Sequence, residues 1–285
     1  MKRQDFRFTE RLRVRWAEID AQQIVFNAHY LSYFDTAVGG YWRALALPYA
    51  DTMAALGGDL FVRKATLEYL GSARYDEQLQ IGVRCERIGN SSLQFIGAVF
   101  RGDDLLVHGE LIYVFADPQT ATSKTVPASL RTVLERFEAG QAITSVRVGS
   151  WAELGAAASA IRQAVFVEEQ KIPADMEWDA ADASCLHAAA FNAFGIPLAT
   201  GRLLEHVPGV AKIGRMAVLR SLRGSHIGRD LLAALLQQAR SEGYREALLH
   251  AQLSAAGFYL RAGFVQRGEA FSEAGISHVE MTRSL

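Results

Sequence analysis

The stretch WAEIDAQQIVFNAHY, residues 16–30, decides the fold of the first half of the chain, because the periodicity of the sequence changes across it. Before it, apolar side chains alternate with arginines over residues 6–16, and this period of two predicts a strand with one exposed face. After it, apolar residues recur at steps of three and four over residues 31–45, which predicts a helix with a broad apolar face. The stretch therefore joins a strand to a largely buried helix.

Strand patterns dominate the residues that follow this helix. Apolar and polar residues alternate over residues 79–85 and 93–99, and turn residues at 102–104 precede a further strand over residues 105–116. One long helix followed by several antiparallel strands predicts an α+β domain.

In the second half of the chain, helical and strand patterns alternate along the sequence. Helices are predicted at residues 156–169, 227–240 and 255–262, and strands at residues 187–203 (two, around a turn), 211–219 and 247–251. This alternation indicates a mixed α/β sheet with crossover connections. We place the boundary at Gly140-Gln141, which predicts domains at residues 1–140 and 141–285.

The composition is that of a globular protein without a marked charge. At roughly 150 residues per domain, a length of 285 residues predicts two domains. Half of the residues are hydrophobic, and the net charge of −1 gives no indication of binding to nucleic acid or to an anionic membrane.

The cysteines and the distribution of apolar residues indicate the cellular compartment. Cys85 and Cys185 lie far apart without the spacing of metal ligands, so we predict neither a disulfide nor a metal site. No apolar run approaches the ~20 residues of a membrane span, and no apolar segment follows the basic residues at the N-terminus. We therefore expect a cytoplasmic protein.

Asp20 is the first candidate catalytic residue. It lies just after a predicted strand, and the predicted helix begins within a few residues of it. Unpaired N–H groups at a helix N-terminus can polarise a carbonyl oxygen, and a nearby carboxylate can attack that carbonyl or activate a water molecule. The alternative is that Asp20 only caps the helix or a turn, and the spacing by itself favours this alternative.

The same stretch resembles the signature of the 4-hydroxybenzoyl-CoA thioesterase-like branch of the hotdog superfamily. The shared features are an aspartate, a short loop and the Val-Phe-Asn sequence before the helix. The resemblance extends over about residues 5–138. The resemblance implies that Asp20 is the nucleophile or general base and that the backbone N–H near Asn27 polarises the thioester carbonyl. It also implies a site at the interface of a homodimer or tetramer. Gln22-Gln23 stands where many relatives carry glycine, which would alter the loop and the acyl group accepted.

A second candidate site is the loop RSLRGSHIG, residues 220–228, between a predicted strand and a long helix. A glycine-containing turn at a helix N-terminus lets backbone N–H groups converge on a phosphate. The loop is neither a P-loop nor a dinucleotide fingerprint, and taken alone it is as well explained by an ordinary tight turn.

The context of this loop resembles the ElaA-type subgroup of GNAT acyltransferases over about residues 145–285. The motifs that carry the resemblance are IRQAVFVEEQ at residues 161–170, ATGRL at 199–203, FYLRAGF at 258–264 and GISHVEM at 275–281. It implies that the backbones of Met216 and Val218 pair with pantetheine and that Tyr259 protonates the departing thiolate. The residues implied to hold the pyrophosphate are Arg223, Gly224, Ser225, Ile227 and Gly228. His226 departs from the family by replacing the first glycine of its Arg-x-x-Gly-x-Gly pattern.

The sequence thus predicts a bifunctional enzyme that hydrolyses an acyl-CoA and transfers an acyl group, most simply acetyl, to an amine. Acyl-CoA and acetyl-CoA are substrates in this interpretation, and no covalently bound cofactor is implied. Two alternatives stay open: only one half is catalytic while the other serves assembly or ligand sensing, or the chain is a CoA-binding regulator. The candidates for the general base of the second half are Glu168, Glu169, Glu177 and His250.

Overall fold

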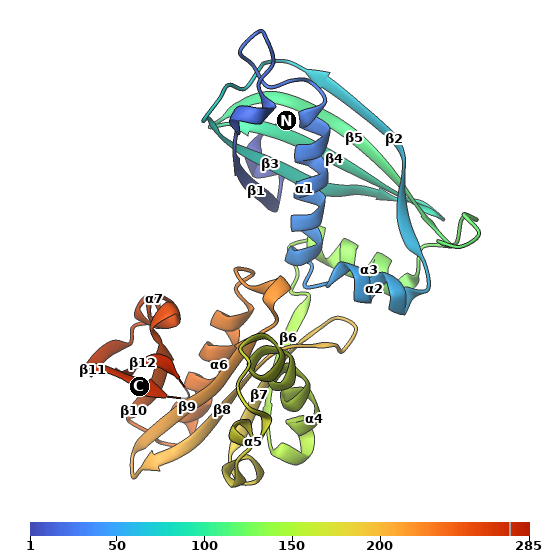
Figure 1. The fold of residues 1–285 in the computed structure, drawn as a ribbon. Helices are drawn as coiled ribbons and strands as arrows, with labels where there is room; N and C mark the ends of the chain where they lie inside the picture. The colour runs from blue at the N-terminus through green and yellow to red at the C-terminus, as the bar shows by residue number, and fades with distance from the viewer. Residues whose placement is uncertain (274) are drawn as a thin grey trace. The chain divides into compact units, whose positions relative to one another are not determined.

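The computed structural model describes residues 1–273 and 275–285, and the chain separates into two compact units (Figure 1). The first unit comprises Met1–Ile143 and the second comprises Thr144–Leu285. Each unit contains one sheet and its own buried apolar clusters.

The first unit is a five-stranded antiparallel sheet against which helix α1 (His29–Ala44) packs (Figure 1). The strand order is β1-β3-β4-β5-β2. The strands are β1 (Phe8–Arg13), β2 (Asp59–Tyr69), β3 (Gln78–Ile88), β4 (Ser92–Arg101) and β5 (Asp104–Ala116). Two shorter helices are α2 (Tyr49–Leu56) and α3 (Ala128–Glu138). A central helix against an antiparallel sheet is the hotdog arrangement, so the α+β prediction for this half is confirmed.

Two glycines let α1 lie close to the sheet. Phe34 of α1 is fully buried, and a Cβ atom at Gly97 of β4 would come within 2.6 Å of its ring. At Gly109 of β5 a Cβ atom would lie 2.5 Å from the carbonyl oxygen of Thr66 and 3.4 Å from the same ring. Any larger residue at these positions would push the helix off the sheet, and α1 carries the pocket described below.

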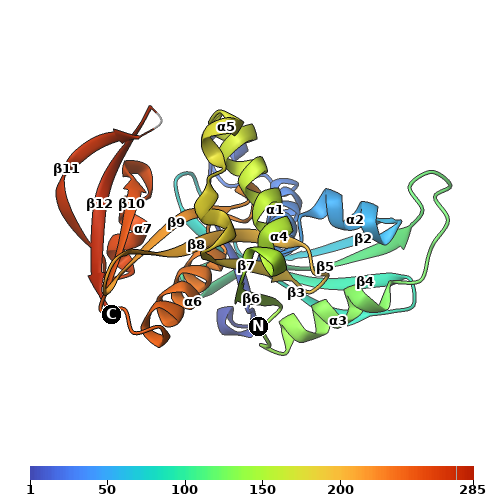
Figure 2. The same ribbon diagram turned by 90° about the horizontal axis from the view of Figure 1, so that it is seen from below.

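The second unit is a seven-stranded sheet of order β11-β12-β10-β9-β8-β7-β6 (Figure 2). Its strands are β6 (Thr144–Gly149), β7 (Leu186–Asn192), β8 (Pro197–Val207), β9 (Val210–Val218), β10 (Glu246–Gln252), β11 (Val265–Glu273) and β12 (Ile276–Ser284). Its helices are α4 (Trp151–Arg162), α5 (Ala174–Glu177), α6 (Ile227–Ser241) and α7 (Ala256–Arg261). Among the described strand pairs, β9 and β10 alone are parallel, so the predicted mixed sheet is confirmed.

Helices α4 and α6 cover opposite faces of this sheet. Ala217 of β9 packs with Ile161 of α4, and its cross-strand partner Thr200 lies on the same face. A Cβ atom at the adjacent Gly201 would meet Leu235 of α6 at 2.8 Å. Because successive residues of a strand face opposite sides, the two helices lie on the two sides of β8 and β9.

The predicted helix over residues 156–169 differs from the structure. Helix α4 ends at Arg162, and Gln163–Glu169 continue as a π-helix. The wider turn keeps Val165 and Phe166 packed with Ile161 in one apolar cluster. Within the described residues, no helix combines the length and the apolar character needed to cross a membrane.

Candidate active sites

A tight hairpin turn carries Asp20. An antiparallel bridge pairs Ile19 with Val25, and the N–H of Asp20 donates to the carbonyl of Ile24 at 2.9 Å. Gln23 has a φ of 61°, in the left-handed region that glycine adopts most easily. The family resemblance predicts a glycine in this loop, and Gln23 adopts there the backbone that a glycine would favour.

One oxygen of the Asp20 carboxylate holds this turn while the other is unbonded. Oδ1 accepts from the N–H of Gln22 at 2.8 Å and from the N–H of Ile24 at 3.4 Å, which is an Asx turn. Oδ2 has no hydrogen-bond partner among the residues that the structure describes. The capping role and a chemical role for Asp20 are therefore compatible.

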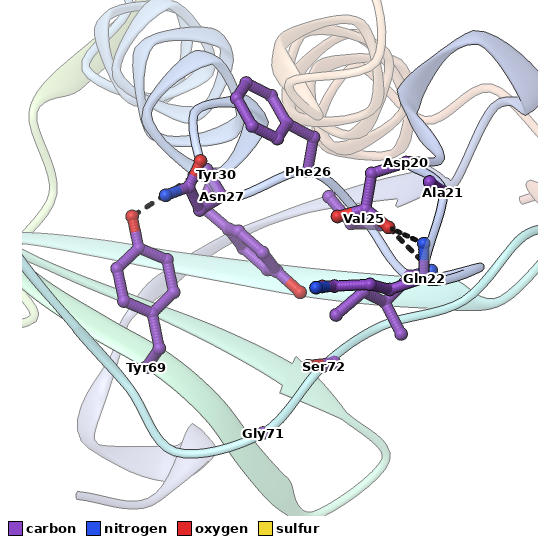
Figure 3. Close-up of a pocket in the computed structure, with 11 residues that line it drawn as sticks. Asp20, Ala21, Gln22, Val25, Phe26, Asn27, Tyr30, Tyr69, Gly71 and Ser72 are labelled. Carbon is purple, nitrogen blue, oxygen red and sulfur yellow. Dashed lines mark hydrogen bonds between the residues drawn. The ribbon is translucent and has the colours of Figure 1, made fainter.

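Asp20 lines a pocket of about 440 Å³ beside the start of α1 (Figure 3). Both predicted residues of the first site, Asp20 and Asn27, border this pocket. The lining residues are Asp20, Ala21, Gln22, Ile24, Val25, Phe26, Asn27, Tyr30, Tyr69, Gly71 and Ser72. Apolar and aromatic walls around one carboxylate suit a thioester with an apolar acyl group.

The N-terminus of α1 offers unpaired donors to this pocket. The helix begins at His29, and its N-cap is Ala28, which has no side chain that could cap it. In the described part of the chain, the N–H groups of Asn27 and Ala28 donate no hydrogen bond. The Tyr69 hydroxyl donates to the carbonyl of Asn27 at 3.2 Å and so fixes the orientation of this peptide. These N–H groups, at the positive end of the helix dipole, are suited to a carbonyl oxygen.

Buried Glu18 stabilises the turn that carries Asp20, a role that was not predicted. Its side chain is 2% exposed and accepts from the Tyr33 hydroxyl at 2.8 Å and from Arg15 Nε at 2.7 Å. Its own carbonyl accepts from the N–H of Phe26 at 2.9 Å. Burial by itself would raise the pKa of Glu18, but the hydrogen bonds from Arg15 and Tyr33 outweigh it and lower the pKa. The buried carboxylate is thus ionised and fixes both ends of the loop.

Tyr30 is both a core residue and a pocket residue. It is 2% exposed, it borders the pocket, and its hydroxyl oxygen accepts from the N–H of Ala73 at 2.9 Å. The hydrogen bond ties α1 to the segment that forms the opposite wall. His29, by contrast, is outside the lining of the pocket.

In the second unit, strands β9 and β10 separate where the second site is predicted. The two strands pair only over residues 210–212 and 246–248. Further along β9, the N–H of Leu219 donates to Leu198 of the other neighbour, β8, at 3.0 Å. Because the backbone of a strand alternates in direction, the N–H of Val218 faces the open edge. Met216, two residues earlier, faces the same edge.

The loop after β9 presents a group of unpaired N–H donors. Gly224 and the helix N-cap His226 have φ angles of 87° and 68°, which turn the chain sharply into α6. In the described structure, four N–H groups here have no acceptor, namely those of Gly224, His226, Ile227 and Gly228. Such a cluster at the start of a 15-residue helix is suited to a pyrophosphate.

Two of the predicted loop residues are engaged elsewhere through their polar groups. Arg223 forms a bidentate ion pair with Glu169, with both distances 2.7 Å, and its Nε donates to the carbonyl of Val218 at 3.2 Å. The N–H and the hydroxyl of Ser225 both donate to the carbonyl of Leu222. The side chains of Arg223 and Ser225 stabilise the loop. Among the described residues of the loop, the unpaired N–H groups are those of Gly224, His226, Ile227 and Gly228.

Tyr259 lies on α7, where its ring packs against Phe258 and Phe264. It is 8% exposed, and burial raises the pKa of Tyr259 to about 12. A Cβ atom at Gly228 would lie 3.8 Å from the ring of Phe258 and 3.3 Å from Val218. The start of α6, the end of β9 and α7 therefore meet through Gly228, Val218 and Phe258, the neighbour of Tyr259 on α7.

The candidates for the general base differ in the hydrogen bonds and ion pairs that they form. The hydrogen bond from Arg223 lowers the pKa of Glu169, and His250 has its two ring nitrogens 3.2 Å and 3.7 Å from Glu273 and Glu280. Glu168 has a single weak contact, from Gln163 at 3.4 Å. Of the four candidates, Glu168 is the carboxylate with the fewest partners.

The fourth candidate, Glu177, belongs to a buried ion network that was not predicted. Arg162 is fully buried and donates to Glu177 Oε1 at 2.6 Å and to Asp182 Oδ1 at 2.8 Å. Arg202 also reaches Asp182, at 2.8 Å. Burial raises the pKa of Glu177. Burial would also raise the pKa of Asp182, but the guanidinium groups of Arg162 and Arg202 bring it down to about 2.

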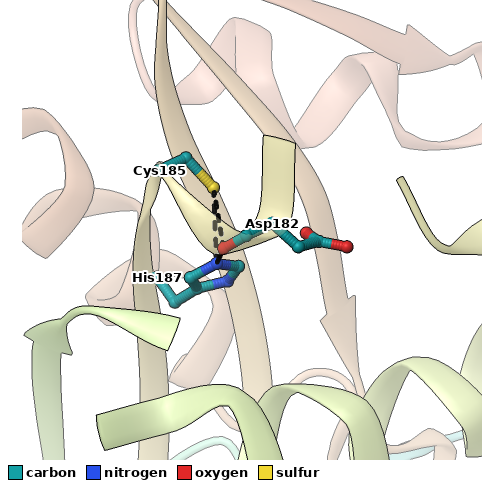
Figure 4. A group of neighbouring side chains, drawn as sticks. All are labelled: Asp182, Cys185 and His187. Carbon is teal, nitrogen blue, oxygen red and sulfur yellow. Dashed lines mark hydrogen bonds between the residues drawn. The ribbon is translucent and has the colours of Figure 1, made fainter. Parts of the chain in front are cut away.

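The same region contains a cysteine–histidine pair with metal-ligand chemistry. Cys185 Sγ lies 3.3 Å from His187 Nε2, which is itself 2.9 Å from the carbonyl oxygen of Asp182. Asp182 is the only third ligand that the described residues offer to this pair, but its carboxylate points away from both side chains (Figure 4) and binds two guanidinium groups. A cation here would lie beside those guanidiniums, so we assign the pair to the core.

Comparison with protein families divides the chain in the same way as its fold. Residues 22–108 match the model of the thioesterase superfamily, and residues 167–285 match that of the GNAT acetyltransferase domain.

Individual relatives are similar to one half of the chain each. A putative acetyltransferase of Bacillus subtilis is 36% identical over 126 residues, which are 43% of this chain and 84% of that protein. A putative esterase of Aquifex aeolicus is 31% identical over 96 residues, 34% of this chain and 74% of that protein. The crystal structure of a putative N-acetyltransferase from Lactobacillus plantarum, 32% identical, covers 50% of this chain and 99% of its own, with a TM-score of 0.48.

Proposed function

The chain belongs to the thioesterase superfamily through its first half and to the GNAT acetyltransferases through its second, and from this we propose that it is a bifunctional enzyme acting on coenzyme A thioesters. The domain at residues 1–140 hydrolyses an acyl-CoA. The domain at residues 141–285 transfers an acyl group, most simply acetyl, from coenzyme A to an amine.

The observation that carries the hydrolase proposal is the pocket that Asp20 shares with the start of α1. The thioester carbonyl oxygen accepts from the free N–H of Asn27, which develops a stronger hydrogen bond as negative charge grows on that oxygen. The unbonded Oδ2 of Asp20 then attacks the carbonyl carbon or removes a proton from an attacking water molecule. The carbon–sulfur bond breaks, and coenzyme A leaves as the thiolate. If Asp20 attacked, water then hydrolyses the acyl–Asp20 anhydride to the free acid; if water attacked, the acid forms directly.

The edge strand β2 supports a homodimer or tetramer built through the first domain. Most side chains of β2 are exposed, including Phe61 at 46%, Val62 at 55% and Tyr69 at 48%. A long unpaired edge with exposed apolar side chains is the feature that a second copy would cover. Tyr69 also borders the pocket, so the covered face and the site would be continuous.

The transferase proposal rests on the open edge of β9 next to the free N–H groups of the α6 loop. The loop residues Gly224–Gly228 receive the pyrophosphate, and the backbones of Met216 and Val218 pair with the pantetheine arm. The amine attacks the acyl carbon in a ternary complex. Tyr259, with its pKa near 12, keeps its proton at neutral pH and gives it to the departing thiolate.

The test is thiol release from a panel of acyl-CoAs, measured without and with a panel of amines. Release without amine identifies the hydrolase and its acyl class, and additional release with amine identifies the transferase and its acceptor. If one activity appears alone, the silent domain serves assembly or ligand sensing. If neither appears and coenzyme A still binds, the chain is a binding protein.

Tyr259→Phe is expected to lower the amine-dependent rate by about 10²-fold, because the thiolate must leave without a proton donor. The amine-independent rate should not change, since that site lies in the other unit. Tyr244→Phe is the matched control in the same unit and should retain full activity. An unchanged amine-dependent rate in Tyr259→Phe would remove Tyr259 from the mechanism.

A further inference from the structure

A β-bulge in β9 lies at the predicted acyl site. Thr200 of β8 pairs with Ala217 of β9, and Arg202 pairs with Gly214. Between these two pairs, the single residue Gly201 of β8 lies opposite two residues of β9, Arg215 and Met216, which is a β-bulge. A bulge of this kind bends its strand and shifts the register of the residues beyond it. Here it begins where the contact between β9 and β10 has ended.

The bulge is held in an unfavourable backbone conformation. Arg215 has a φ of 52°, in the left-handed region where an L-residue with a Cβ atom is disfavoured. No turn sequence surrounds it, because its neighbours Gly214 and Met216 belong to the same strand. Contacts of the Arg215 side chain must therefore offset this cost.

Those contacts come from Glu177, the last residue of α5, and from Asp179 just after it. Nη2 of Arg215 donates to the carbonyl of Glu177 at 3.2 Å and to Asp179 Oδ2 at 3.3 Å, and its Nε lies 3.3 Å from Glu177 Oε1. The acceptors are themselves fixed, since Arg162 Nε lies 2.6 Å from Glu177 and Arg202 Nη1 lies 2.7 Å from Asp179. Arg215 is thus clamped by a segment that is anchored independently of β9.

We propose that Arg215 is a positioning residue for acyl-CoA: its ion pairs with Glu177 and Asp179 hold the bulge that presents the backbone of Met216 and Val218 at the open edge of β9. The role rests on the proposed transferase function. Without the clamp, β9 relaxes toward a regular strand, the register shifts by one residue, and the two donors turn away from the pantetheine arm.

Two substitutions at Arg215 separate this role from a merely structural one. Arg215→Ala removes the ion pairs but keeps the Cβ atom, so the left-handed backbone is no longer supported. Arg215→Gly removes the same ion pairs but accepts that backbone without strain. We expect the Kd of acetyl-CoA, measured by calorimetry, to rise about 30-fold in the alanine variant (roughly 2 kcal/mol) and to stay within about threefold of wild type in the glycine variant.

Asp179→Asn is a milder third variant should Arg215→Ala not fold, because Asp179 is partly exposed; we expect a Kd about threefold above wild type. Equal affinities in the alanine and glycine variants would overturn the proposal, as would an alanine variant that binds like wild type. A wild-type chain that binds no acetyl-CoA would overturn the transferase function itself, and this role of Arg215 with it.

Discussion

Asp20→Asn is expected to lower the amine-independent release of thiol from acyl-CoA by about 10³-fold. The amide oxygen can still accept from the N–H groups of Gln22 and Ile24, so the turn should keep its shape. What is lost is the negative charge and basicity of Oδ2, the atom without a partner in the described structure. Thiol release with a colorimetric thiol reagent measures the change, and the free energy of unfolding should be nearly unaffected.

Asp76→Asn is the matched control for this variant. Asp76 lies in the same unit, has a φ of 66°, which asparagine tolerates, and pairs with Arg13 at the surface. It lies outside the lining of the pocket, so its substitution should leave the rate of hydrolysis unchanged. If Asp20→Asn kept more than about a tenth of the wild-type rate, a residue other than Asp20 would supply the nucleophile or base.

Arg162→Met is expected to destabilise the second unit by about 3–5 kcal/mol, because it leaves buried carboxylates without their cation. Arg162 is fully buried, with four hydrogen bonds to Glu177 and Asp182. Urea unfolding measures the loss. The transition of the second unit should move to lower urea, while the transition of the first unit, followed through hydrolase activity, should stay in place.

A variant that also removes the carboxylates shows whether the loss of stability comes from unpaired charge or from lost packing. Adding Glu177→Gln and Asp182→Asn to Arg162→Met removes the two carboxylates that the methionine leaves exposed to an apolar environment, so part of the stability should return. A single Arg162→Met variant within about 1 kcal/mol of wild type would show that Arg202 and Arg215 balance the carboxylates on their own.

The sequence predicted the fold, and it pointed to two candidate sites, because the signals for both are local. The change of period around residues 16–30 and the glycine-containing loop before a helix both lie in short stretches. The backbone N–H of Asn27 and the loop donors at Gly224–Gly228 follow from where a helix begins, which the sequence indicates to within a few residues.

The features that were missed depend on residues far apart in the chain. An arginine on a helix such as Arg162 is ordinarily solvated, and only the folded chain brings Glu177 and Asp182 to it. The left-handed backbone of Arg215 has no sequence signal at all, since arginine is not a turn residue. Glu18, two residues before Asp20, is buried because its partner Tyr33, fifteen residues further along the chain, lies over it in the fold.

The open edge of β2 has a consequence for how the chain is synthesised. The ribosome completes β2 long before the second unit. The unpaired edge of β2 is therefore exposed to other nascent chains while synthesis continues. Its exposed charges Arg63, Lys64 and Glu68 make indiscriminate pairing with foreign strands unfavourable. If the proposed homodimer forms through this edge, two copies translated from one message pair through β2 before either second unit is complete, and assembly begins during synthesis.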